Sequence, residues 1–445
     1  MSNRVPAEQP EQVSVDEKKR GITRKESTAI LLASLVAAVS AFAATVIAQR
    51  SLSAEQNTEF LLFWSLLFGL FGVIAGIQQE TTRAVGAARL QGAASGQQGA
   101  RVVPVALLLG TCIALGAAVT SPEWAPDQIP SHVGLGVALI AVGAVLYSAH
   151  SAMSGAAAGR EKWYIFAILG GGEAAWRLVA MLLAAVLVGS LVGLEAAVVS
   201  ASLLWVVLLL ASSQVRQVAG SRADVGAGRL TRNILFAMGS SAASAVLTVA
   251  FPTLLNWSLE EQSTSVETAA LGFLILAISL TRSPIMIPLQ AFQGVAISAF
   301  LKQRHRPVAA MSKPAGALLA VGALGAVAAW LIGPWLFSLI YERKDDAGAA
   351  YDMVNQGWVL GGLTFASAIM ALLVLSGTAV IALNAHKVYI TGWLVGAVVT
   401  TGLLFVVPLD LVPRAMVALY VGPLLGFLTH LAGMVAVARA ENSDA

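Results

Sequence analysis

Long blocks of apolar residues alternate with short polar segments along nearly the whole chain after residue 26. A helix of roughly 20 apolar residues crosses the hydrocarbon core of a bilayer, which is about 30 Å thick, at a rise of 1.5 Å per residue. The pattern therefore predicts an all-α polytopic membrane protein with twelve transmembrane helices. The predicted spans are approximately 27–48, 58 into the segment GIQQETTRAVGAAR, 102–120, 133–156, 163–190, 193–213, 233–256, 268–300, 314–341, 357–384, 388–409 and 415–438.

A polar, basic segment, QVRQVAGSRADVGAGRLTR, divides these spans into two sets of six. Because six is an even number, both sets begin on the same side of the membrane, which predicts two pseudo-symmetric six-helix lobes related by an axis along the membrane normal. The predicted organisation is a disordered cytoplasmic tail at 1–26, an N-terminal lobe at 27–213, a cytoplasmic connector at 214–232, a C-terminal lobe at 233–438 and a cytoplasmic tail at 439–445.

Composition and charge agree with a membrane protein whose termini are both cytoplasmic. The chain is 57% hydrophobic and only 11% charged, which excludes an ordinary soluble globule. Cytoplasmic loops carry an excess of Lys and Arg, and an inside N-terminus places 21 basic residues in the tails and inner loops and four in the outer loops. We therefore expect a multi-pass membrane protein, and the Ala-, Val- and Gly-rich composition indicates a bacterial inner (plasma) membrane.

The eighth predicted span, TAALGFLILAISLTRSPIMIPLQAFQGVAISAF, carries Arg282 near its middle. A guanidinium at that depth costs at least ~2.5–3.5 kcal/mol unless it is hydrated or paired. Gln293 falls on nearly the same stripe of the helix, and Gln290 lies at its margin. This stripe predicts the wall of a polar cleft, where Arg282 binds a phosphate; a structural counter-ion to Glu173 or Glu80 is the alternative.

Polar residues also mark the second and fifth spans. Gln79, Glu80 and Arg83 end the second span, and matching TTRA to LTRS aligns Arg83 with Arg282, whereas matching the span starts does not. In the fifth span Glu173 precedes Arg177 by four residues, the favoured order for a helical ion pair. The pair either neutralises itself or leaves Glu173 to carry a coupling ion and Arg177 to bind substrate. Glu80 is a second candidate for ion coupling.

Nothing in the sequence indicates an enzyme. The loops are short, and they carry no metal-ligand spacing, no catalytic Ser, His and Asp grouping and no ATP-binding motif. The single Cys112 excludes internal disulfides. We therefore expect a transporter without a cofactor, without a bound metal and without a nucleic-acid partner.

The arrangement resembles the polysaccharide and lipid-linked oligosaccharide flippases (Wzx-like) of the MOP superfamily, which also contains the MATE exporters and the peptidoglycan precursor flippase. The features that carry the resemblance are the two sixes of spans, the segment GIQQETTRAVG and the segment SLTRSPIMIPLQA continuing into KQRHR. It implies two lobes around a central cavity lined by the first, second, seventh and eighth helices. It would place Arg282 and Arg83 in this cavity, with Arg177, Gln290, Gln293, Gln79 and Glu80 as further candidates.

The expected function is an alternating-access flippase that moves a polyprenyl-phosphate-linked saccharide, a cell-envelope glycan precursor, from the cytoplasmic to the outer leaflet. Its partners would be that lipid-linked oligosaccharide and membrane lipids, with envelope glycosyltransferases as further candidates. Two alternatives stay open. One is a MATE-like proton- or sodium-coupled exporter of drugs or other small molecules, and the other is a non-transporting scaffold for glycosyltransferases.

Overall fold

The computed structural model describes residues 23–91, 99–259, 265–302, 307–383 and 385–443. Within these ranges, eleven helices are long and apolar enough to cross a membrane, and a bent pair of shorter helices brings the number to twelve. The predicted all-α polytopic fold is therefore confirmed. Most of the tail predicted at 1–26 lies outside the described residues.

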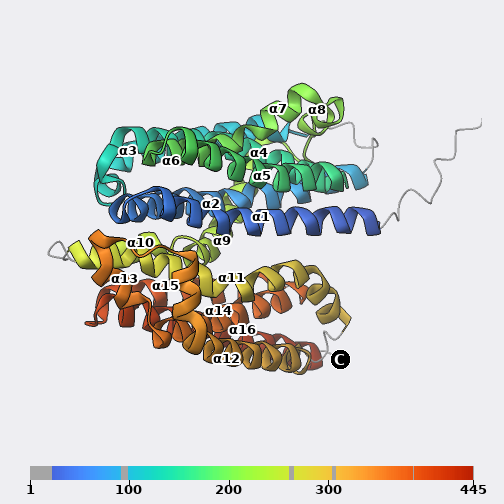
Figure 1. Cartoon of the computed structure of the whole chain (residues 1–445). Helices are drawn as coiled ribbons and strands as arrows, with labels where there is room; N and C mark the ends of the chain where they lie inside the picture. Colours follow the sequence, from blue (N-terminus) through green and yellow to red (C-terminus); the bar gives the residue numbers. More distant parts are fainter. Residues whose placement is uncertain (1–22, 92–98, 260–264, 303–306, 384, 444–445) are drawn as a thin grey trace, which may run out of the picture.

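The helices form two groups stacked side by side, with the first half of the chain in one group and the second half in the other (Figure 1). The side on which the described chain begins at residue 23 and ends at residue 443 is called the tail side below, and the opposite side the far side. The first group comprises α1 (Arg24–Ser51), α2 (Ala54–Gln91), α3 (Val102–Gln128), η3 (Pro130–His132), α4 (Val133–Gly159), α5 (Trp163–Leu187), α6 (Leu191–Ser200), η4 (Ala201–Leu203), α7 (Leu204–Ala211) and α8 (Ser213–Ala219). The short helices α6, η4 and α7 together make one span.

The second group begins within the segment predicted as the connector at 214–232, because α8 takes up most of its first residues and α9 its last ones. It comprises α9 (Ala227–Thr248), α10 (Phe251–Trp257), α11 (Ser265–Lys302), α12 (Pro307–Ile340), η5 (Asp345–Ala347), α13 (Gly348–Val354), α14 (Gly357–Ala382), α15 (His386–Val406) and α16 (Leu411–Ser443). The stretch expected to form one span at 233–256 is broken: α9 and α10 meet at an angle of 69°.

Pro252 accounts for this break. In a continuous helix the N–H of residue 252 would donate to the carbonyl of Thr248, but proline has no N–H and its ring clashes with that carbonyl. The backbone N–H groups of Val249 and Ala250 both turn back to the Ala245 carbonyl, at 2.9 and 3.0 Å, and the helix ends there.

Glycines let α2 of the first group approach α9 of the second. A Cβ added at Gly76 would lie 2.3 Å from the backbone nitrogen of Met238, and one at Gly72 would lie 2.7 Å from the Cβ of Ala245. Small residues at four-residue spacing permit such close packing of membrane helices. The seam between α2 and α9 is therefore a tight backbone-to-backbone contact.

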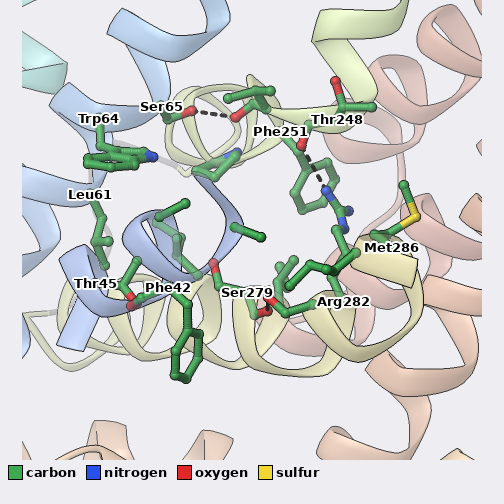
Figure 2. Close-up of a pocket in the computed structure, with 18 residues that line it drawn as sticks. Phe42, Thr45, Leu61, Trp64, Ser65, Thr248, Phe251, Ser279, Arg282 and Met286 are labelled. Atoms are coloured by element: carbon green, nitrogen blue, oxygen red, sulfur yellow. Dashed lines mark hydrogen bonds between the residues drawn. The ribbon is translucent and has the colours of Figure 1, made fainter. Parts of the chain in front are cut away.

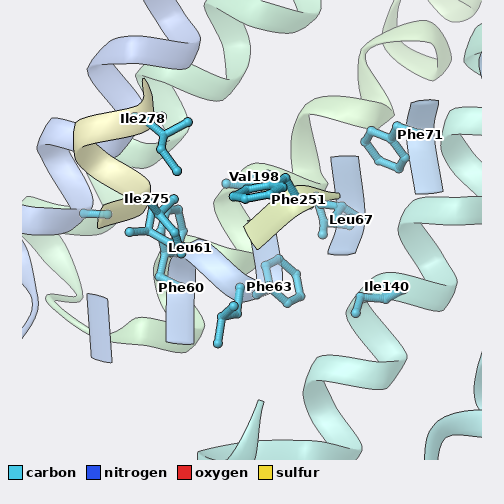
Figure 3. Close-up of a cluster of buried hydrophobic side chains, with 14 of the residues drawn as sticks. Phe60, Leu61, Phe63, Leu67, Phe71, Ile140, Val198, Phe251, Ile275 and Ile278 are labelled. Carbon is cyan, nitrogen blue, oxygen red and sulfur yellow. The ribbon is translucent and has the colours of Figure 1, made fainter. Parts of the chain in front are cut away.

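One apolar core crosses from one half to the other near this seam. Phe60 and Leu61 of α2 are buried together with Phe251 of α10 and Ile275 and Ile278 of α11 (Figure 3). Without water to drive helix association inside a bilayer, close packing of this kind holds the halves together.

On the far side, polar groups at the end of α1 join the halves. Gln49 donates from Nε2 to the Glu342 carbonyl at 2.7 Å, and its Oε1 accepts from the Glu342 N–H at 3.0 Å. Arg50 donates to the carbonyls of Leu339 and Ile340, and Lys344 donates to the carbonyl of Leu52 at 2.5 Å. These contacts, called the far-side clasp below, tie the two halves together on the far side.

Candidate binding site between the two halves

A cavity of about 280 Å³ lies between the halves, enclosed by α1, α2, the broken span α9–α10 and α11 (Figure 2). These are the first, second, seventh and eighth spans, the set that the sequence resemblance implied. The cavity is lined by Ala38, Ala41, Phe42, Thr45, Leu61, Trp64, Ser65, Thr248, Val249, Phe251, Pro252, Ile275, Ile278, Ser279, Arg282, Ser283, Met286 and Ile287.

Arg282 is the only cationic side chain among these lining residues. It reaches from α11 past the ring of Phe251, and its Nη1 donates to the Thr248 carbonyl at 2.9 Å (Figure 2). Guanidinium has five N–H donors, and its buried Nε has no hydrogen-bond partner. Within the part of the chain that the structure describes, no carboxylate oxygen lies within 4.0 Å of it. Arg282 therefore has donors left for a ligand.

The rest of the wall is mostly apolar, and several of its hydroxyls already donate within their own helices. Thr45 donates to the Phe42 carbonyl at 2.8 Å, and Ser283 donates to the Ser279 carbonyl at 2.7 Å. Trp64 lies across the cavity from Arg282 (Figure 2). The cavity thus combines one positive charge with an apolar wall, and these two features suit an anionic group attached to a hydrocarbon chain.

The polar end of the second span lies elsewhere. Gln79, Glu80 and Arg83 line a separate cleft of about 580 Å³ with residues of α9, α14 and α15. Arg83 pairs with Glu80 at 2.6 Å and with Asp224 of the connector at 3.1 Å. Glu80 also accepts from the Asn233 amide at 3.0 Å, and Gln79 donates to the Ser241 hydroxyl at 3.2 Å. The three predicted residues therefore bind neighbouring elements of the protein.

Arg83 and Arg282 do not occupy equivalent positions along α2 and α11. Arg83 lies 29 residues after the start of α2 at Ala54, and Arg282 lies 17 residues after the start of α11 at Ser265. The difference of 12 residues corresponds to about 18 Å along a helix axis. Arg83, with 48% of its side chain exposed, occupies a different depth from Arg282 and does not line the cavity.

The structure also separates Arg177 from the cavity. Arg177 and Glu173 pair within α5, with 3.3 Å between Nη2 and Oε2, and both side chains are at most 10% exposed. The Arg177 guanidinium lies over the rings of Trp64 and Phe68, at 5.6 and 4.8 Å from their centres. Arg177 therefore stands behind Trp64, inside the first half. The two glutamines predicted beside Arg282 belong to α11, but the side chains of Gln290 and Gln293 lie outside the described part.

A buried cluster of His132, Glu59 and Glu195 is not among the residues predicted from the sequence. His132 lies between two carboxylates near the far side: its Nε2 is 2.5 Å from an oxygen of Glu195, and its Nδ1 is 3.6 Å from an oxygen of Glu59. Ser131 donates to Glu59 through both its N–H and its hydroxyl. The signal was available, since Glu59 and Glu195 interrupt apolar blocks, but their common partner follows only from the fold.

Comparison with solved structures identifies the fold as that of the MATE transporters of the MOP superfamily. An inward-facing multidrug resistance MATE family transporter superposes with a TM-score of 0.66 at 15% identity, covering 94% of this chain and 100% of that one. A MOP superfamily transporter from Pyrococcus furiosus, described as having a binding pocket of reversed polarity, gives 0.64 at 15% identity, covering 95% and 97%. The chain is thus a multi-pass membrane protein of this fold.

Two mycobacterial proteins are much closer in sequence. Rv3630 of Mycobacterium tuberculosis strain H37Rv is 31% identical over 409 residues, which cover 92% of this chain and 91% of that protein. Rv1510 of the same strain is 32% identical over 414 residues, covering 93% and 92%. No protein-family model matches the chain. The protein belongs to the same family as these two mycobacterial proteins.

Proposed function

We propose that the protein is an alternating-access flippase that moves a polyprenyl-phosphate-linked saccharide from the cytoplasmic to the outer leaflet of the bacterial inner membrane. Both termini lie in the cytoplasm in this proposal, so that the tail side faces the cytoplasm. The observation that carries the proposal is Arg282, a cation without a carboxylate partner in the described part of the chain, in the cavity between the halves.

Charge selects the class of ligand. A guanidinium with free donors in a low-dielectric cavity attracts phosphate oxygens and accepts them in pairs. The described lining contains no Asp or Glu that would attract a cationic drug. Glu80 and Glu173, the two carboxylates predicted for ion coupling, are each paired with an arginine. An anionic ligand therefore fits this cavity better than a cationic one.

The apolar wall selects what is attached to the phosphate. Side chains of α1 and α11, among them Phe42, Met286 and Ile287, would lie against a hydrocarbon chain. A cavity of about 280 Å³ holds a phosphate or diphosphate group with its first carbons, but not an oligosaccharide as well. The saccharide would enter as the two halves separate, while Arg282 retains the phosphate.

Transport by the purified protein in liposomes tests the proposal, with a fluorescent saccharide on a short polyprenyl diphosphate as the substrate. Wild-type protein should move the substrate between leaflets, and Arg282→Gln should not. Loss of charge-assisted hydrogen bonds costs about 1.5–3 kcal/mol, or roughly 10- to 150-fold in affinity. Lys313→Gln, on the exposed face of α12, is the matched control and should transport normally. Normal transport by well-folded Arg282→Gln would refute the proposal.

A MATE-like exporter driven by protons or sodium is the second candidate. The similarity of the fold to MATE transporters favours it, and so does the pair of buried carboxylates, Glu59 and Glu195, which could exchange a cation through His132. Efflux of a cationic dye from the same liposomes under an imposed proton gradient, without movement of the lipid-linked saccharide, would establish this function instead.

A further inference from the structure

The carbonyl of Thr248 takes up one of the hydrogen-bond donors of Arg282. It lies 2.9 Å from Nη1 of Arg282, at the wall of the cavity, where a phosphate oxygen would bind the same guanidinium (Figure 2). This carbonyl lacks a donor within its own helix because residue 252 is proline. A side chain from another helix therefore satisfies an acceptor that the break in the seventh span has exposed.

A second side chain holds the same break from the opposite wall. The hydroxyl of Ser65, on α2, donates to the Val249 carbonyl at 2.9 Å. The N–H of Thr253, which would otherwise donate to that carbonyl, reaches the Ser65 hydroxyl at 3.4 Å, and the Thr253 hydroxyl is 2.9 Å from it. Ser65 is thus inserted into the hydrogen-bond ladder between Val249 and Thr253, a recognised cause of sharp helix kinks.

The break is therefore braced from both halves. Ser65 belongs to the first half and Arg282 to the second, and both line the cavity. Their two acceptors are consecutive carbonyls, of Thr248 and Val249. If the guanidinium of Arg282 moves away, the Thr248 carbonyl loses this donor and the hydrogen bond between α9 and α11 is broken. The hydrogen bond from Ser65 of α2 to Val249 remains.

We propose that an anionic ligand exchanges with the Thr248 carbonyl at Arg282, so that binding in the cavity releases the bend of the seventh span. This inference rests on the proposed function, because it takes the ligand to be a lipid-linked phosphate. It assigns Arg282 two roles, ligand binding and support of the break, and makes Pro252 and Ser65 positioning residues. Binding of the phosphate is thereby coupled to the conformation of the broken span, which contacts both halves.

The bend can be measured as a distance between spin labels at its two ends. Arg229→Cys on α9 and Trp257→Cys on α10, both exposed, carry the labels in a Cys112→Ala background. With a rise of 1.5 Å per residue, full straightening of the 69° bend would lengthen the separation by about 6 Å. Farnesyl diphosphate serves as the ligand and farnesol, its uncharged counterpart, as the control, with the protein in lipid nanodiscs.

Without further substitutions we expect a short separation between the labels. Farnesyl diphosphate should widen the distribution of separations and shift it to longer values, whereas farnesol should not. Pro252→Ala restores the missing N–H and should give the longer separation without ligand. Arg282→Gln should widen the distribution without ligand and abolish the response. Ser65→Ala should weaken the support of the break and so widen the distribution of separations without ligand. Ser312→Ala, on the exposed face of α12, should leave that distribution unchanged.

Two results separate this inference from the proposed function. Binding of farnesyl diphosphate without any change in the separation would overturn the exchange and leave the binding site standing. Absence of binding would overturn the claim that the cavity takes an anionic ligand. The separations measured without ligand would then decide whether Arg282 and Ser65 support the break. Wild-type separations in both Pro252→Ala and Arg282→Gln would overturn the brace.

Discussion

Glu173 and Arg177 form an ion pair one turn apart on α5, and the guanidinium of Arg177 is also stacked over Trp64 and Phe68 of α2. The stacking supplies a second site of attraction for a buried cation, since a guanidinium over an aromatic face gains electrostatic energy. Because Trp64 also lines the cavity, the ion pair supports one wall of the cavity from behind.

Removal of one partner of this pair should destabilise the fold. Glu173→Leu leaves the buried Arg177 without a counter-charge, and breaking a buried pair in this way costs about 3–5 kcal/mol. Thermal unfolding in detergent should show the loss. The double variant Glu173→Leu/Arg177→Met should recover most of it, because two apolar side chains replace two buried charges. Equal unfolding temperatures for wild type and Glu173→Leu would show that the pair is not needed for stability.

The seam between α2 and α9 should not tolerate even one extra methyl group. In Gly76→Ala the new Cβ would lie 2.3 Å from the Met238 backbone nitrogen, so the helices must separate. Overpacking of this kind costs about 1–3 kcal/mol. Gly116→Ala on α3, where no atom lies within 4 Å of the added Cβ, is the matched control. Unfolding measurements should distinguish the two, and equal stability of both variants would contradict the close approach.

His132 should be essential for stability near the far side. His132→Leu leaves Glu59 and Glu195 without the imidazole that lies between them, and the loss of a shared partner for buried carboxylates should cost about 3–5 kcal/mol. Glu195→Gln should be milder because its amide can still form a hydrogen bond with the imidazole. His386→Leu, at an exposed position, should unfold like wild type, as measured by intrinsic fluorescence.

The far-side clasp should control access to the cavity. Gln49→Leu removes both hydrogen bonds to the Glu342 backbone, worth about 1–3 kcal/mol together. This should shift the population toward conformations open on the far side. A membrane-impermeant thiol reagent applied from that side should then label Thr45→Cys faster in a Cys112→Ala background. Glu55→Gln, exposed at the start of α2, should leave the labelling rate unchanged.

The sequence indicates the spans and the depth of Arg282 because both depend on local properties. Apolar blocks long enough to cross a bilayer predict helices wherever they occur, and a cation in the middle of such a block predicts a polar cavity. The four-residue spacing of Gly72 and Gly76 is likewise a local pattern that favours close helix packing, and in the structure both glycines lie where α2 approaches α9.

The partners of each charge depend on the three-dimensional packing. The order of Glu173 and Arg177 predicts an ion pair, but nothing local to α5 shows that Trp64 and Phe68 cover the guanidinium. The contact between Arg83 and Asp224 depends on where the connector folds back. Pro252 is a visible helix breaker, whereas Ser65, which enters the broken ladder, is 188 residues away from Thr253.

The contact of α2 with α9 at Gly72 and Gly76 has a mechanical consequence. Long interlocking side chains would have to change rotamer whenever two helices turned against each other, whereas glycine and alanine have no rotamers to change. The line where Gly72 and Gly76 meet Ala245 and Met238 can therefore serve as the axis of rotation between the halves, with little resistance to a small turn.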